Sequence, residues 1–107
     1  MALWQVVEDV EAGKIDADLG EGVIKQRIAR PGQGKSSGYR AIILYQKGEK
    51  TFFVYGFAKK DEANISPNEE KAFKKSAVIL LELSDESLNE QIEAGNFVEV
   101  KRDDENI

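Results

Sequence analysis

The sequence predicts an α+β fold, a small antiparallel β-sheet arranged as a meander with helices packed on one side. Three stretches rich in β-branched and aromatic residues, at 23–30, 38–46 and 50–59, follow one another closely. Their connections are too short for the crossover that a parallel pair needs, so they favour antiparallel neighbours. Helical patterns lie before and after them. A chain of 107 residues suits one modest core, so we expect one domain over residues 1–100 and a flexible tail over 101–107.

A short helix is expected first. An apolar stripe recurs at helical spacing and Gly13 is a plausible end; the stripe consists of Leu3, Val6, Val7 and Val10. The stretch DADLGEG at 16–22 carries two glycines and is expected to form a loop.

The first strand, VIKQRIAR, alternates between a core face and a cationic face. Gln26 and Ile28 point to the core side, whereas Lys25 and Arg27 point the other way. The second and third strands, GYRAIILYQ and KTFFVYGFAK, are strongly β-forming. Because the third is apolar on both faces, we expect it to be central in the sheet.

Two helices are expected after the strands. Ser66, Pro67 and Glu69 form a capping box with proline at the first helical position. The stripe that would lie on the sheet consists of Phe73, Ala77, Leu80 and Leu81. Ser84 is expected to cap a second helix that Gly95 ends, and FVEV at 97–100 is expected to be a short last strand.

The composition excludes several classes of chemistry. The chain has no cysteine and no histidine, so thiolate metal sites and histidine-based triads are excluded, and we expect neither a metal nor another cofactor. The start has no basic segment and no long apolar run, which favours a cytoplasmic protein without membrane contact.

Charge is unevenly distributed along the chain. Residues 23–60 hold nine lysines and arginines against one glutamate, a net charge of +8, whereas the rest holds six against nineteen, a net charge of −13. Such a basic centre indicates an anion-binding surface. The alternative is that these cations only decorate exposed strand faces.

The octapeptide ARPGQGKS at 29–36 fits the loose pattern of a nucleotide phosphate loop, with Lys35 for a phosphate and Ser36 for magnesium. A phosphate loop opens a helix, whose first amides hold the phosphates. Here the loop leads into YRAIILY, a strand by every local criterion. Nucleotide binding is therefore rejected, and the loop is expected to join two strands.

The same region collects cations that suit a polyanion backbone, namely Lys25, Arg27, Arg30, Lys35 and Arg40. Four aromatic residues in the strands are available for base stacking, namely Tyr39, Tyr45, Tyr55 and Phe57. Aromatic residues in strands more often belong to the core, so both alternatives stay open for each of them.

The stretch GVIKQRIARPGQGKSSGYRAIILY, followed by FFVYGFAKKDEANIS, resembles the RelE/HigB-like toxins of bacterial type II toxin–antitoxin systems. The resemblance covers roughly residues 16–100. Its most specific parts are the K-x-R strand, the GKSSGYR junction and the VYGFAKKDEANI strand end.

The resemblance implies a metal-independent endoribonuclease, an mRNA interferase that acts on the ribosome. In such toxins the 2′-hydroxyl of the RNA attacks the adjacent phosphate, and cations orient the backbone and stabilise the added charge. It also implies a cognate antitoxin, a helix-turn-helix protein, besides mRNA and the ribosome as partners. A homodimer is a further possibility.

By position, the resemblance assigns catalytic roles to Lys25, Arg27, Arg40 and Lys60. The RNA-binding residues expected beside them are Arg30, Lys35, Tyr39 and Lys59.

The sequence departs from the family's pattern at three places. Ile65 and Ser66 stand where some relatives have a tyrosine, and Lys60 stands where some have arginine, which loses a two-pronged phosphate contact. The first helical segment is also shorter than in relatives, which could leave apolar surface for an antitoxin or a second copy of the chain. The alternative function is therefore a weak or inactive relative that binds RNA or an antitoxin-like partner.

Overall fold

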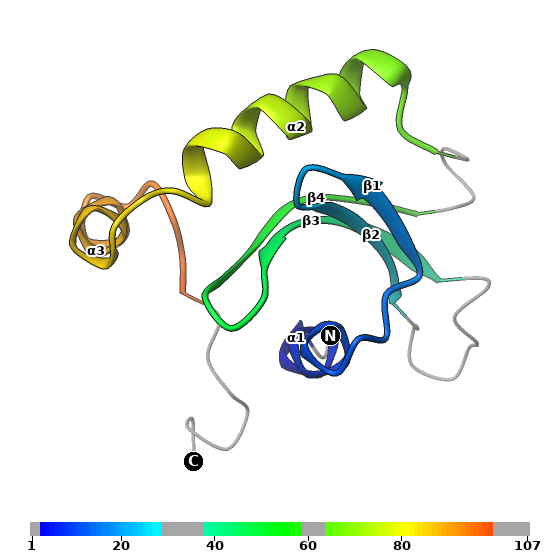
Figure 1. Ribbon diagram of the computed structural model, residues 1–107, viewed down its shortest axis with the longest axis horizontal. Coiled ribbons are helices and arrows are strands. Elements are labelled where there is room, and N and C mark those ends of the chain that lie inside the picture. The colour runs from blue at the N-terminus through cyan, green and yellow to red at the C-terminus, as the bar shows by residue number, and fades with distance from the viewer. Residues whose placement is uncertain (1–2, 29–37, 59–63, 100–107) are drawn as a thin grey trace.

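The fold is a four-stranded antiparallel meander with helices on its two faces, and the computed structural model describes residues 3–28, 38–58 and 64–99 (Figure 1). The strands follow the chain in the order β1-β2-β3-β4. They are β1 (Ala17–Gly20), β2 (Val23–Ile28), β3 (Tyr39–Gln46) and β4 (Lys50–Ala58). The helices are α1 (Leu3–Glu11), α2 (Pro67–Leu80) and α3 (Asp85–Glu93). The predicted α+β class and the antiparallel meander are confirmed.

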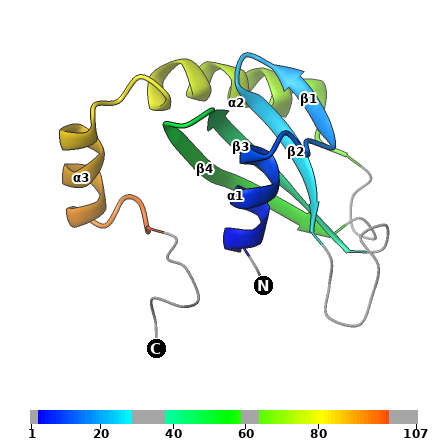
Figure 2. The ribbon, with the colours of Figure 1, turned by 60° about the horizontal axis from the view of Figure 1, so that its bottom comes forward.

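The two faces of the sheet carry separate apolar clusters, because successive strand residues point to opposite sides. On one face Val6 and Val10 of α1 pack with Ile24 and Ile43. The opposite face packs under α2, where the cluster includes Val23, Ile42, Leu44 and Ala77. The expectation of helices on one side therefore holds for α2, whereas α1 covers the other face (Figures 1 and 2). The physical reason is that β2 and β3 present apolar side chains on both faces.

The order of the strands corrects two expectations. β3 lies inside the sheet and its residues 41–44 are buried, while β4 pairs only with β3 among the described residues. The third predicted strand is thus an edge strand, and its apolar residues on both faces reflect packing above and below the sheet. The loop expected at 16–22 contains β1. Gly20, Glu21 and Gly22, all with positive φ, then make the turn into β2.

The helix signals in the sequence are confirmed. The Ser66 hydroxyl accepts from the amide of Glu69 at 3.1 Å, and the Glu69 carboxylate accepts from the amide of Ser66 at 2.8 Å. Ser84 caps α3 through the amide of Ser87. In contrast, residues 97–99 form no strand, and Phe97 instead packs its ring 5.7 Å from that of Phe52. The predicted tail at 101–107 lies outside the described residues.

Gly22 provides a test of the contact between the β1–β2 turn and α2. A Cβ at Gly22 would lie 2.7 Å from Cδ1 of Leu81 and 3.3 Å from the carbonyl oxygen of Tyr45, with φ at +83°. Gly48 has φ at +74° but open space around it. We expect Gly48→Ala to cost about 1 kcal/mol from the backbone alone. Gly22→Ala should cost about 2–4 kcal/mol, since overpacking adds to the same strain.

Urea unfolding of both variants measures the difference. Equal losses of unfolding free energy would mean that the turn does not pack against residue 81 as described.

Candidate nucleic-acid interface

The pairing of β2 with β3 brings three sequence-predicted cations to one face of the sheet. Arg27 stands opposite Arg40, and Lys25 stands opposite Ile42. All three point to the side that α2 covers. Arg27 and Arg40 lie towards the strand ends away from the β3–β4 turn, whereas Lys25 stands beside buried Ile42. We call Lys25, Arg27 and Arg40 the cationic face. Along β3 the surface therefore changes from buried Leu44 and Ile42 to a partly exposed Arg40.

Arg27 is held by the carboxylate of Asp16, which no sequence pattern singles out. One oxygen of Asp16 accepts from the backbone amide of Arg27 at 2.7 Å, and the other lies 3.2 Å from its guanidinium. Asp16 is fixed in turn by buried Gln26, whose side chain accepts from the Asp16 amide and donates to the carbonyl of Lys14. The guanidinium of Arg27 is thus oriented, and its charge is partly compensated.

Lys25 is held differently. Its ammonium donates to the side-chain oxygen of Asn64 at 3.2 Å, and the same oxygen accepts from the backbone amide of Ile65 at 2.9 Å. Asn64 was also missed as a candidate, although it stands in the ANIS segment that carries the family resemblance. Only the folded chain places it beside a residue 39 positions earlier.

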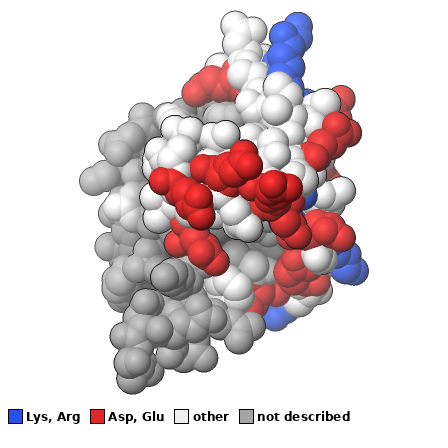
Figure 3. Space-filling model, turned by 90° about the vertical axis from the view of Figure 1, so that its left-hand side faces the viewer, with Lys and Arg blue, Asp and Glu red and all other residues white. Residues whose placement is uncertain are grey.

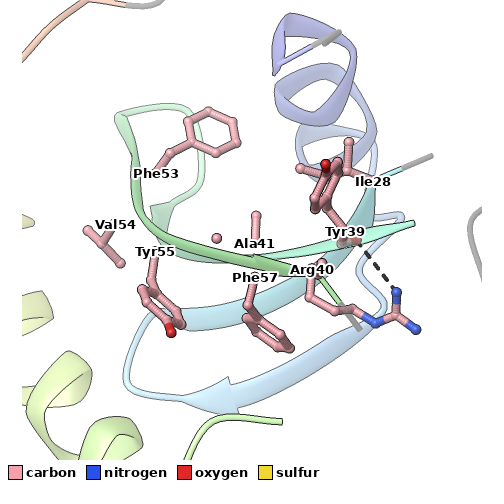
Figure 4. A pocket seen from close by; sticks show the side chains of 10 residues that line it. Ile28, Tyr39, Arg40, Ala41, Phe53, Val54, Tyr55 and Phe57 are labelled. Carbon is pink, nitrogen blue, oxygen red and sulfur yellow. Dashed lines mark hydrogen bonds between the residues drawn. The ribbon is translucent and has the colours of Figure 1, made fainter. Parts of the chain in front are cut away.

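Arg40 lies at the start of β3, beside an open pocket of about 530 Å³ along the β3–β4 pair. Its guanidinium donates to the carbonyl of Tyr39 at 3.5 Å. Figure 4 shows Arg40, Tyr55 and Phe57 on one face of the sheet and Tyr39 and Phe53 on the other. Tyr39 is 39% exposed. It is therefore accessible, but it lies on the face opposite the cationic face.

The other three aromatic candidates for base stacking belong to the packing of the fold. Tyr55 has ring neighbours at 5.8 Å in Phe57 and at 5.9 Å in Phe73 of α2. Phe57 is buried. Tyr45 packs against the α1-side cluster and donates its hydroxyl to Glu11.

Four predicted site residues, Arg30, Lys35, Lys59 and Lys60, lie outside the described residues, as does Ser36. The described chain resumes at Gly38 and enters β3 directly. The prediction that the glycine-rich stretch leads into a strand, and not into a helix, is therefore confirmed at its described end.

The molecule carries opposite charge elsewhere. α3 has four acidic residues and no basic one, and Figure 3 shows acidic side chains gathered on that side of the molecule. A polyanion is repelled from this acidic side and attracted to the cationic face, so these charges would orient its approach. Among the described residues, no group of three or more acidic side chains is arranged to hold a metal ion.

Comparison with protein families gives a match over nearly the whole chain. The model of the RelE toxin of the RelE/RelB toxin–antitoxin system matches residues 1–100. The chain belongs to the RelE toxin family. No curated protein and no solved structure gives a significant match.

Membership in the RelE family gives the general class of activity and partner. RelE toxins belong to toxin–antitoxin systems and generally cleave mRNA, and their partner is a RelB-type antitoxin. Within the described ranges no helix is long and apolar enough to cross a membrane.

The pKa of Tyr45 allows a test of its packing and of its hydrogen bond to Glu11. Burial of the ring, with the hydrogen bond to Glu11 and its charge, raises the pKa of Tyr45 above the ordinary 10.0. The unfolded chain loses this proton first, so stability should fall as the pH rises from about 10 through the folded-state pKa. Tyr45→Phe should lose less stability over that window than the parent. Urea unfolding from pH 9 to 11 measures the difference.

Glu11→Gln serves as the matched control, since it keeps an acceptor but removes the charge. Its loss of stability over this pH window should lie between those of the parent and Tyr45→Phe. A parent and a Tyr45→Phe variant with identical alkaline profiles would contradict the contact.

Proposed function

We propose that this RelE-family protein is a metal-independent endoribonuclease that cleaves mRNA on the ribosome, using the cationic face to bind the scissile phosphate. The observation that carries the proposal is the pairing of Arg27 with Arg40, with Lys25 on the same face. Placing these like charges together costs energy in the free protein. A bound phosphate would relieve that repulsion.

The chemistry fits a chain without histidine. The 2′-oxygen of the RNA attacks the adjacent phosphorus and passes its proton to water, and the bond to the 5′-oxygen breaks as that oxygen takes a proton from water. The products are a 2′,3′-cyclic phosphate and a 5′-hydroxyl. The pentacoordinate phosphate in between carries extra negative charge, which fixed cations stabilise more than they stabilise the substrate.

The three cations take different parts in this proposal. Arg40 is the principal stabiliser of the transition state, because its planar guanidinium suits a two-pronged contact with phosphate oxygens. Lys25 supplies a second, point-like charge. Arg27 orients the RNA backbone. Because it is paired with Asp16, it stabilises the added negative charge less than Arg40 does. Arg30, Lys35, Lys59 and Lys60 are proposed to extend the RNA contact, from their position in the sequence alone.

Arg40→Ala is the direct test. The side chain is only partly buried, so folding should be nearly unchanged. Cleavage of mRNA on programmed ribosomes should fall about a hundredfold or more, the scale of losing one transition-state donor. Arg40→Lys should recover part of the activity, since it restores the charge without the fork.

Lys47→Ala is the matched control, because Lys47 is an exposed cation in the turn between β3 and β4, outside the cationic face. It should cleave like the parent. Equal activity of Arg40→Ala and the parent would refute the role of Arg40. A parent that neither cleaves mRNA nor arrests growth on induction would favour the inactive, RNA-binding or antitoxin-binding relative.

A further inference from the structure

We propose that Asn64 is a positioning residue that aims the ammonium of Lys25 at the scissile phosphate without cancelling its charge. The proposal rests on the proposed function, since it assigns Asn64 a role in that same reaction. It concerns a residue outside the strands, at the entry to α2.

The contact joins a mobile group to a fixed one. A lysine side chain has about four rotatable bonds, and holding its end in one place costs conformational entropy. The side-chain oxygen of Asn64 accepts from the Lys25 ammonium at 3.2 Å and from the Ile65 amide at 2.9 Å. Ile65 is buried, with 8% exposure, in the cluster under α2. The oxygen that holds Lys25 is therefore anchored to the core.

The chemical identity of the acceptor matters as much as its place. Arg27 is held by a carboxylate, which compensates its charge, whereas Lys25 is held by a neutral amide. Among the residues that the structure describes, no carboxylate forms an ion pair with Lys25. An ammonium has three donors, so one bond to Asn64 leaves two directions for phosphate oxygens. Within the described residues, Lys25 is thus oriented by a neutral group.

Asn64→Asp separates this role from a structural one. Aspartate is nearly the same size and keeps both acceptor contacts, so a residue needed only for folding would tolerate it. A carboxylate beside Lys25 would instead neutralise the ammonium and repel the RNA phosphate. We expect Asn64→Asp to melt like the parent and to cleave about tenfold to a hundredfold more slowly. Asn64→Ala should slow cleavage by about tenfold, because it only releases the ammonium.

A double-mutant cycle shows whether Asn64 acts through Lys25. In a Lys25→Ala background, Asn64→Ala should have almost no further effect on the rate of cleavage. In an Arg40→Lys background it should have its full effect, since Arg40 is outside the contact. Binding of a non-cleavable 2′-O-methyl RNA should follow the same pattern, with Asn64→Asp the weakest of the single variants of Asn64.

The outcomes distinguish this inference from the proposed function. If the parent cleaves RNA but Asn64→Asp cleaves equally well, the inference is wrong while the proposed function stands. The same holds if Asn64→Ala slows the Lys25→Ala variant as much as it slows the parent. If the parent neither cleaves nor binds RNA, the proposed function is wrong, and the role of Asn64 is wrong with it.

Discussion

The register between β2 and β3 is the constraint on which the rest of the structure depends. It runs without interruption from Val23 opposite Leu44 to Ile28 opposite Tyr39. Because side chains alternate along a strand, a slip of one residue would turn every side chain of one strand to the other face. Arg40 would then leave the side that carries Lys25 and Arg27, and buried Ile43 would exchange faces with Ile42. The same hydrogen-bonded ladder therefore fixes both apolar clusters and the cationic face.

This arrangement explains how a small sheet combines a core with a charged surface on one face. α2 covers the part of the face that holds Val23, Ile42 and Leu44. Arg27 and Arg40 occupy the remaining part, and Lys25 stands beside Ile42. Polar groups from neighbouring segments hold two of these cations. Asp16 reaches Arg27 from the segment before β1, and Asn64 reaches Lys25 from the segment before α2. Both contacts cross from one element to another, so the fold orients the charges more firmly than a single strand could.

Much of the fold could be predicted from local patterns, and the exceptions depend on tertiary contacts. The capping box at Ser66 and the alternation in β2 are local signals, and both are confirmed. β1 was missed because its glycine-rich turn is read locally as a loop. The edge position of β4 was missed because apolar residues on both faces do not tell a central strand from an edge strand that packs on both sides. Within the site, Lys25 and Arg27 share a face by alternation alone. In contrast, only folding brings Asp16 next to Arg27 and Asn64 next to Lys25.

RNA is proposed to bind the protein at the cationic face. Nuclear magnetic resonance of the labelled protein, titrated with a short 2′-O-methyl RNA, tests it most directly. We expect shifts in the amide and side-chain signals of Lys25, Arg27 and Arg40, with α3 unchanged because its acidic residues repel the ligand. Shifts confined to α3 or to the α1 side of the sheet, with the signals of these three cations unmoved at saturation, would contradict it.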